Sequence, residues 1–204
     1  MTVSGPDALT YLHGQLSQDI RDLRVGDRCW TFVLQPTGKI DVLALLTRTG
    51  DDSFELRTDP GHGETLLARI DRFKIRVAAD TGLRPSPGPV SAELERDRVE
   101  RGWPKMGAEI VTGETIPAET GVTPFAVDFR KGCYPGQELV ERMDSRGAAA
   151  PRSLRRFTVS EEAAPGDPVV VDGAEVGVLT SVCGTTALGY VKRGVDAGEL
   201  ITHS

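Results

Sequence analysis

The stretch Lys131-Gly132-Cys133-Tyr134-Pro135-Gly136-Gln137-Glu138 decides how the rest of this chain is interpreted. Two glycines, a proline, a lone cysteine, an amide and a carboxylate separate an apolar run at 123–129 from a helical pattern on Leu139, Val140 and Met143. Because glycine and proline interrupt regular structure, the octapeptide is predicted to be a loop. Loops of this composition are better suited to holding polar groups at a site than to filling a core.

Cys133 is the residue of this loop with the most reactive side chain. The following helix is expected to begin near Pro135 or Gly136, and the cations Arg130 and Lys131 stand just upstream. A helix N-terminus and nearby cations favour the thiolate, so the pattern predicts an accessible, functional thiol. The alternative is a small buried cysteine without a role. No histidine is near in sequence, so a protease-like Cys–His pair has no support.

The start of the helix carries polar residues with two interpretations. Glu138 and Arg142 are spaced i, i+4 with the acid first, which favours a solvated pair on the helix surface. Gln137 and Glu138 stand beside a glycine, and such groups also hydrogen-bond the edge of a flat heterocycle. Spacing alone leaves both interpretations open.

A basic cluster spans the end of a predicted helix and the residues after it: Arg69, Arg72, Lys74 and Arg76. Cations at a helix C-terminus interact favourably with the helix dipole, so a solvated face is the simpler interpretation. The second interpretation is an anion site for a ligand that carries a carboxylate.

Asp41 interrupts an apolar strand and is a candidate site acid. An edge position with the carboxylate in water explains it equally well. The aromatic residues Trp30, Phe32 and Phe73 are predicted to belong to the core and not to a stacking platform.

Composition limits the classes of function. The chain has 204 residues, 39% apolar and 26% charged, with a net charge of −6 from 30 acidic and 24 basic residues. An acidic balance argues against strong binding to nucleic acid, which depends on cations at phosphates. Three scattered cysteines form neither a disulfide framework nor a metal site. Without a leader pattern or a long apolar stretch, the protein is expected to be cytoplasmic and independent of membranes.

Residues 1–150 are predicted to form an α+β region. A helix begins at Gly5-Pro6-Asp7 and continues with apolar residues to Ile20. Strands are expected at 28–34, 40–47, 54–58 and 74–78, and a second helix at 64–73. The first two strands flank the turn Gln35-Pro36-Thr37-Gly38 and therefore predict a hairpin.

The second half of the chain is predicted to contain loops, one charged helix and short strands. Residues 82–90 are a Pro/Gly-rich loop, 93–101 a charged helix and 110–117 a short strand. The small residues and proline of 147–151 mark the expected boundary between domains 1–150 and 151–204. Beyond it, short strands at 154–159, 168–171, 175–180 and 186–191 predict a small barrel or sandwich.

The octapeptide, continued by Leu139-Val140-Glu141-Arg142, closely resembles the signature of the YgfZ-type folate-binding proteins, relatives of the glycine-cleavage aminomethyltransferase (T-protein). Weaker similarities occur in the family's order along most of the chain. They include Val3–Ala8, the turn Thr37-Gly38-Lys39-Ile40, Arg72-Phe73, residues 98–107, Ile116-Pro117, residues 176–181 and residues 188–191.

The resemblance implies α+β lobes and a C-terminal β-barrel arranged around a central opening that binds tetrahydrofolate. It implies a role in the assembly or repair of iron–sulfur enzymes, with Cys133 and Asp41 as functional groups. The expected folate-binding residues are Lys131, Tyr134, Gln137, Glu138, Arg142 and Arg72. Arg and Lys side chains would meet the glutamate tail of the folate. The partners implied are a reduced folate and iron–sulfur enzymes or their assembly factors.

Two departures from the aminomethyltransferase pattern bear on catalysis. Those enzymes carry two adjacent aspartates after the hairpin turn, whereas Asp41 is followed here by Val42. The region between 77 and 93 is also much shorter than the family's middle lobe and lacks its Tyr-Thr-Gly-Glu type segment. We therefore expect an accessory protein and not a glycine-cleavage aminomethyltransferase. Two alternatives stay open: a folate-dependent aminomethyltransferase, and a non-catalytic scaffold of the same fold.

Overall fold

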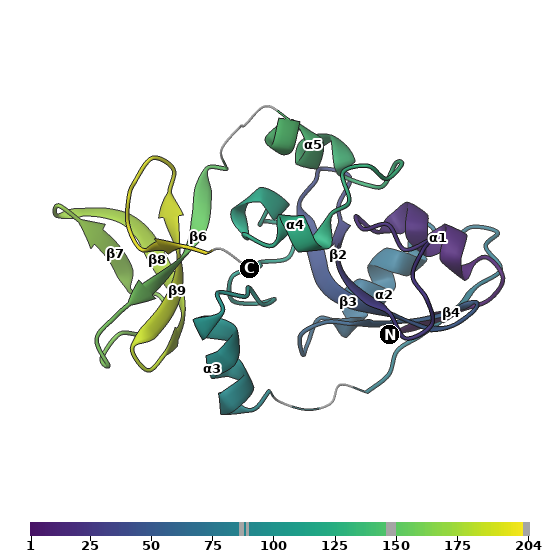
Figure 1. Ribbon diagram of the computed structural model, residues 1–204, viewed down its shortest axis with the longest axis horizontal. Coiled ribbons are helices and arrows are strands. Elements are labelled where there is room, and N and C mark those ends of the chain that lie inside the picture. Colours follow the sequence, from purple (N-terminus) through teal and green to yellow (C-terminus); the bar gives the residue numbers. More distant parts are fainter. Residues whose placement is uncertain (86–87, 89, 146–149, 202–204) are drawn as a thin grey trace.

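The computed structural model describes residues 1–85, 88, 90–145 and 150–201, which contain two antiparallel five-stranded sheets (Figure 1). The N-terminal sheet has the strand order β2-β3-β4-β1-β5. Its strands are β1 (Thr2–Ser4), β2 (Arg28–Leu34), β3 (Ile40–Gly50), β4 (Ser53–Arg57) and β5 (Asp80–Gly82). The predicted hairpin is confirmed, because β2 pairs with β3 from Arg28 opposite Thr47 to Leu34 opposite Ile40.

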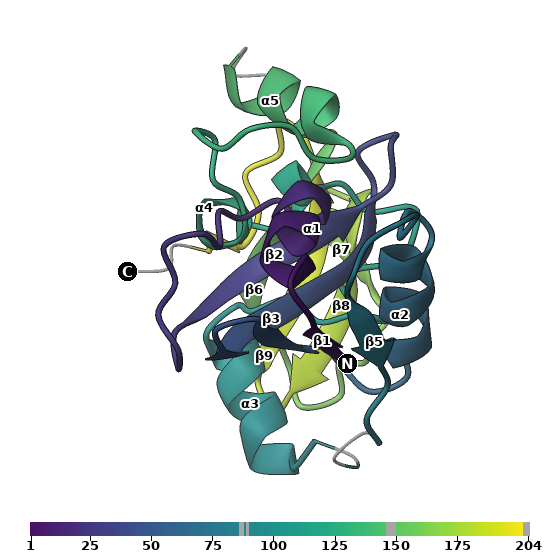
Figure 2. The same ribbon diagram turned by 90° about the vertical axis from the view of Figure 1, so that its right-hand side faces the viewer.

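One face of this sheet is covered by α1 (Ala8–Gln15) and α2 (Gly63–Asp71), with α1 in front of the strands in Figure 2. Alternate residues of β3 and the apolar sides of both helices form one buried cluster. Its central members are Leu12, Leu16, Val42, Ala44, Leu46, Leu66 and Ile70. The leucines and the isoleucine of these helices recur at helical spacing and face the sheet, as the sequence predicts.

The opposite face is covered by residues 103–140, which hold α4 (Thr123–Ala126) and the first turn of α5 (Gln137–Ser145). A second buried cluster joins Phe32, Leu34, Ile40 and Leu43 of the sheet to Ile110, Val122, Ala126, Tyr134 and Val140. The sheet thus has an apolar layer on each side, and Phe32 belongs to the core as predicted.

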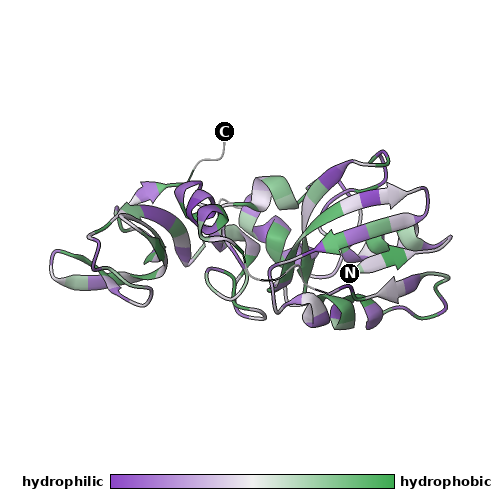
Figure 3. Cartoon of the chain, turned by 90° about the horizontal axis from the view of Figure 1, so that it is seen from below, coloured by the Kyte–Doolittle hydropathy of each residue, from purple (hydrophilic) through white to green (hydrophobic). Residues whose placement is uncertain are grey.

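The second sheet has the order β10-β6-β9-β8-β7. Its strands are β6 (Arg152–Thr158), β7 (Pro168–Val171), β8 (Ala174–Cys183), β9 (Thr186–Lys192) and β10 (Glu199–Leu200). Val99 of α3 (Ala92–Glu100) packs against its Leu154, Leu188 and Tyr190. Figure 3 shows the two strand-rich lobes at opposite ends of the molecule. A strand-rich C-terminal unit is confirmed, and its closure into a barrel stays a prediction.

The strand predicted at 74–78 is wrong. Arg76 has a φ of +56°, which breaks an extended run, and Ile75 is 77% exposed. The strand forms later, as β5, and pairs with β1. The short β1 was itself not predicted, because three residues are too few to show an alternating pattern.

The first helix is shorter than predicted. It ends at Gln15, and Leu16 is extended and bridges Val33 on the edge strand β2. The chain at 110–117 is likewise not a strand. Ile110 forms a bridge with Met106, a turn follows, and Pro117–Glu119 is a single 3-10 turn. At Leu16 pairing with a distant strand replaces the helical pattern, whereas at 110–117 a local turn replaces the strand.

Two predictions lie partly outside the described residues. The boundary at 147–151 includes 147–149, and the loop at 82–90 includes 86, 87 and 89. The division into domains 1–150 and 151–204 therefore stays a prediction. No helix in the described ranges has both the length and the apolar character needed to cross a bilayer.

Candidate functional site

The signature octapeptide is anchored by Lys131, which is buried. Its ammonium group donates hydrogen bonds to the backbone carbonyls of His13 and Leu16, each at 2.5 Å. The last carbonyls of a helix lack partners within the helix, so Lys131 caps the C-terminus of α1. Burial lowers the pKa of Lys131 to about 8. The structure thus places this predicted folate-binding residue against a helix end.

Tyr134 is also buried and packs beneath the same ammonium group. The Nζ atom of Lys131 lies 5.0 Å from the centroid of the Tyr134 ring, a cation–π geometry. Burial raises the pKa of Tyr134 to about 12. Both residues therefore stabilise the loop itself, and their predicted contact with a ligand stays a prediction.

Gly136 fixes the other end of the octapeptide. It has a φ of +81°, and a Cβ atom added to it would lie 2.5 Å from the backbone oxygen of Gln35 and 2.8 Å from the Cα of Gly38. Only glycine allows both this backbone conformation and this approach. The octapeptide thus joins α1, the β2–β3 turn and α5.

Cys133 and Gly132 lie between these two anchors and are exposed. All three cysteines are free, but Cys29 is half-buried and burial raises its pKa to about 12. The interpretation of Cys133 as a buried cysteine without access is therefore wrong. The loop holds a thiol at the surface on a backbone that its neighbours fix.

The polar residues at the start of α5 do not converge. Glu138 and Arg142 are both exposed, and among the described residues they make no ion pair with each other, contrary to the simpler prediction. Instead, the amide Nε2 of Gln137 donates to Oε1 of Glu141 at 2.5 Å. Gln137, Glu138 and Arg142 therefore lie on the helix surface.

Asp41 is buried at the start of β3. Its Oδ2 lies 3.2 Å from Nε of Arg69, and its Oδ1 accepts a hydrogen bond from Nε2 of Gln35 at 2.8 Å. Arg69, which is 6% exposed, also donates to the carbonyl of Leu34. The interpretation of Asp41 as an edge residue in water is wrong. A carboxylate engaged on both oxygens is held in one orientation.

The basic cluster is divided by its own ion pairs. Arg69 pairs with Asp41, and Lys74 pairs with Asp71 at 3.2 Å. Arg72 is exposed, with its guanidinium 5.7 Å from the ring centroid of Phe73. Phe73 is 41% exposed, so its predicted place in the core is wrong.

A cavity of about 270 Å³ lies between the N-terminal sheet and α3, and sequence reasoning missed it. The rings of Trp30 and Trp103 meet there, with centroids 4.8 Å apart and an angle of 44° between their planes. Its other lining residues include Leu43, Arg57, Asp59, Arg98 and Lys105. Trp30 thus contributes to a cavity wall as well as to the core.

Asp59 is the carboxyl group of this cavity. Its Oδ2 accepts a hydrogen bond from the backbone N–H of Met106 at 2.8 Å, and burial raises its pKa. A partly buried carboxyl beside two indole rings suits a flat heterocycle with N–H groups on its edge. Asp59 was not singled out from the sequence because Thr58-Asp59-Pro60-Gly61 has the composition of an ordinary turn.

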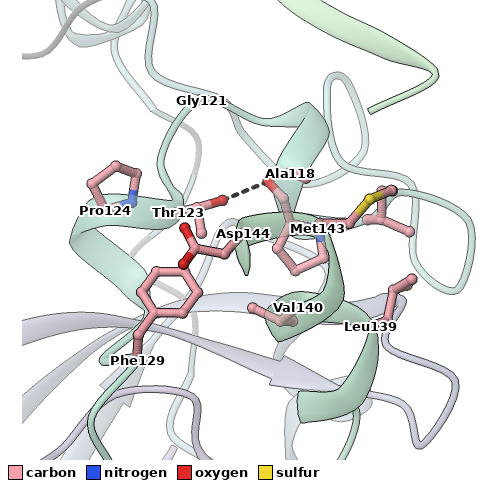
Figure 4. Close-up of a pocket in the computed structure, with 11 residues that line it drawn as sticks. Ala118, Gly121, Thr123, Pro124, Phe129, Leu139, Val140, Met143 and Asp144 are labelled. Carbon is pink, nitrogen blue, oxygen red and sulfur yellow. Dashed lines mark hydrogen bonds between the residues drawn. The ribbon is translucent and has the colours of Figure 1, made fainter. Parts of the chain in front are cut away.

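A second cavity, of about 310 Å³, lies between α5 and residues 116–124 (Figure 4). It is lined mainly by apolar side chains, among them Ile116, Pro124, Phe129, Leu139, Val140 and Met143. Cys133 is on the turn that connects Phe129 to Leu139, and it lines neither this cavity nor the one at Trp30. The described residues hold no group of three His, Cys, Asp or Glu side chains arranged for a metal ion.

Comparison with known proteins confirms the resemblance. No protein-family model matches the chain. The chain is 26% identical to an iron–sulfur cluster assembly factor, the mitochondrial IBA57 homolog of Neurospora crassa, over 82% of this chain and 54% of that protein. It is 29% identical to an aminomethyltransferase of Streptomyces avermitilis, over 93% of this chain and 49% of that enzyme.

The fold agrees with these relationships. The crystal structure of the glycine cleavage system aminomethyltransferase T from Bartonella henselae matches 94% of this chain and 75% of its own with a TM-score of 0.74 at 17% identity. The α+β fold of the aminomethyltransferases is therefore shown. The chain is related to the IBA57-type assembly factors and to the aminomethyltransferases. It spans about half the length of the curated relatives it matches.

Proposed function

We propose that this protein binds a reduced folate, tetrahydrofolate or a derivative, and supports the assembly or repair of iron–sulfur enzymes through Cys133. Support for the iron–sulfur role comes from the relationship to the assembly factors named above. Support for folate comes from the relationship to aminomethyltransferases and from the cavity at Trp30 and Trp103.

The aromatic cavity carries the folate proposal. Its volume of about 270 Å³ is near the lower end for small-molecule sites, so it suits the bicyclic pteridine and leaves the rest of the folate outside. The pteridine would stack on the indole rings of Trp30 and Trp103. The carboxyl of Asp59 would face the N–H groups on the edge of the heterocycle.

The tail of the folate requires a cation at the mouth of the cavity. Arg57 lines the cavity and is exposed, and a guanidinium pairs well with the carboxylates of a glutamate tail. Lys105 lines the same cavity, although it also pairs with Glu95 at 2.6 Å. When bound, the folate would supply one-carbon or redox chemistry, and the protein would supply stacking, orientation and shielding from water.

Calorimetric titration with 5-formyltetrahydrofolate tests this site, with tryptophan fluorescence as a second signal. Because stacking on an aromatic side chain contributes about 1–3 kcal/mol, we expect Trp103→Ala to weaken binding by about 5- to 150-fold. Asp59→Asn is expected to weaken it as well. Arg72→Ala is the matched control, because Arg72 is exposed beside Phe73 and lines neither cavity.

Two outcomes would reject this part of the proposal. A loss of binding in Arg72→Ala without one in Trp103→Ala would move the site to the basic cluster. No saturable heat at millimolar folate would favour the scaffold alternative.

Cys133 is proposed as the thiol that acts on the iron–sulfur partner. Its exposure on a turn fixed by Lys131 and Gly136 is the observation that supports this role. Replacing the native gene in its source organism by Cys133→Ser should lower the activity of iron–sulfur enzymes and leave cluster-free enzymes unchanged. Cys183→Ser serves as the control, and equal effects of both variants would remove the role.

An aminomethyltransferase reaction is the second candidate function. Position 42, where those enzymes carry the second aspartate, is held here by Val42, which is fully buried against α1 and α2. No carboxylate is therefore available at that position. Formation of methylenetetrahydrofolate from tetrahydrofolate and an aminomethylated carrier protein would overturn our preference. The cytoplasmic location expected from the sequence stays a prediction, since the assembly factor of Neurospora crassa is named as mitochondrial.

A further inference from the structure

The apolar cavity beside α5 is used neither by the folate proposal nor by the octapeptide anchors. Its walls come from three segments: the turn around Ile116 and Pro117, the helix α4 at Thr123 and Pro124, and α5 with the residue Phe129 that precedes the octapeptide. Figure 4 shows Phe129, Leu139, Val140 and Met143 around it. Phe129 is partly exposed, so part of this apolar surface faces solvent.

One charged group enters the cavity. Among the described residues that line the cavity, Asp144 is the only ionisable one, and Figure 4 shows its carboxylate between Thr123 and Phe129. The hydroxyl of Thr123 already donates to the carbonyl of Pro117 at 2.8 Å. Among the described lining residues, the polar side chain that is still available is therefore the carboxylate of Asp144, at an apolar opening.

Within the part of the chain that the structure describes, the other charges near the cavity do not cancel this one. Leu139, Val140, Met143 and Asp144 occupy one side of α5, and helical geometry turns Glu138, Glu141 and Arg142 away from it. Arg130 is almost fully exposed and lies 3.6 Å from Asp128, which balances it. Glu119 of the neighbouring turn pairs with Arg152 at 3.2 Å.

We propose that this cavity binds a large apolar side chain of a partner protein that is followed or preceded by a lysine or arginine. The apolar side chain fills the space between Phe129 and Met143, and the adjacent cation meets Asp144. A buried apolar anchor with a charged neighbour at the rim is the usual composition of a small protein-binding pocket. The described side chains that line its volume of about 310 Å³ are apolar except for Thr123 and Asp144, which favours one apolar side chain over a polar cofactor.

The position of the cavity would bring a docked partner protein close to the octapeptide. Phe129 and Leu139 flank the octapeptide, so a partner docked there lies along the same loop as Cys133. The use of this proximity rests on the proposed function of Cys133. The binding itself does not, and it is tested without folate, iron or the thiol.

Methionine methyl groups report directly on this cavity. The chain has three methionines: Met143 lines the cavity, while Met1 and Met106 are buried elsewhere. We would label the protein with [13C-methyl]methionine and titrate it with acetyl-phenylalanyl-lysine amide. The Met143 signal is expected to shift and saturate, and the Met106 signal in the core should stay in place.

A series of probes separates the apolar anchor from the charge. Acetyl-phenylalanyl-glutamate amide should bind about two- to fivefold more weakly, the range expected for one exposed ion pair. Acetyl-alanyl-lysine amide should give no saturable shift. Asp144→Asn should remove the difference between the lysine and glutamate probes, and Glu141→Gln, on another side of α5, should retain it. Phe129→Ala should weaken both phenylalanyl probes.

Three results would overturn the proposal. They are equal binding of the lysine and glutamate probes to the unmodified protein, the absence of a saturable Met143 shift with any probe, and an unchanged shift in folded Phe129→Ala. If Phe129→Ala does not fold, judged by the Met106 signal, the charge series with Asp144→Asn still decides. None of these results depends on folate binding, so failure here leaves the proposed function standing.

Discussion

The backbones of Gly38 and Gly136 are in direct contact. A Cβ atom on Gly136 would lie 2.8 Å from the Cα of Gly38, and one on Gly38 would lie 2.5 Å from the Cβ of Leu139. Both glycines have positive φ angles, +83° and +81°. The β2–β3 turn and the start of α5 are therefore fitted to each other, and the signature glycine is required by packing.

We expect Gly136→Ala to destabilise the protein by about 2–4 kcal/mol, because the alanine adds backbone strain and an overlap with fixed backbone atoms. Gly132→Ala is the matched control, since a Cβ at Gly132 would meet no atom within 4 Å. This control should change stability by about 0.5 kcal/mol or less. Urea unfolding measures both. Equal losses in the two variants would contradict a packing role for Gly136.

Lys131→Met tests the cap on α1. The variant leaves the carbonyls of His13 and Leu16 without their donor, so we expect a loss of about 1–3 kcal/mol near neutral pH.

The pH dependence of this loss has a definite sign. The pKa of Lys131 falls from 10.5 to about 8 on folding, so between these values the unfolded chain binds more protons than the native one. This group's contribution to stability therefore rises as pH increases from about 8. Parallel urea series at about pH 7.5 and about pH 9.5 measure this effect. The difference in unfolding free energy between wild type and Lys131→Met should be larger at the higher pH. If the difference in unfolding free energy does not change with pH, folding does not lower the pKa of Lys131.

The sequence predicted the elements with long periodic patterns and missed those set by distant contacts. The β2–β3 hairpin and α2 followed from alternating and helical apolar positions. In contrast, β1 exists only because it pairs between β4 and β5, and Leu16 leaves its helix to bridge Val33. Local patterns carry no information about such pairing.

The same limit applies to the candidate site. The octapeptide was predicted to be a loop with an accessible thiol, and Cys133 is exposed there, whereas its function stays a prediction. The burial of Lys131 was not predictable, because its acceptors, the carbonyls of His13 and Leu16, are more than a hundred residues away. Tyr134 is likewise buried in a cluster with residues of the distant N-terminal sheet. The cavity of Trp30, Asp59 and Trp103 combines segments that sequence spacing does not relate.

Alkylation of the cysteines tests the exposure of the signature thiol. The thiolate is the reactive form, and burial raises the pKa of Cys29 to about 12, whereas Cys133 is exposed. In native protein at about pH 8, iodoacetamide should modify Cys133 at least tenfold faster, roughly, than Cys29. Peptide mass spectrometry over time gives both rates, and the same reaction in urea is the control. Comparable rates in the native protein would show that the turn does not present the thiol.

Glu109 connects the C-terminal sheet to the rest of the chain, and its replacement should destabilise this junction. Its buried carboxylate accepts hydrogen bonds from Arg98 at 2.9 Å, Thr180 at 2.8 Å and Ser181 at 2.6 Å. Removing the buried charge of Glu109 leaves Arg98 with Glu95, at 2.7 Å, as its remaining ion-pair partner among the described residues, so Glu109→Gln should cost about 3 kcal/mol. The exposed pair of Asp97 with Arg101 provides the control, and Asp97→Asn should cost less than about 1 kcal/mol. Because Thr180 and Ser181 are in β8, amide hydrogen exchange should accelerate in β8 of Glu109→Gln before it does in β3. Uniform acceleration in both sheets would mean that Glu109 supports the whole fold and not this junction.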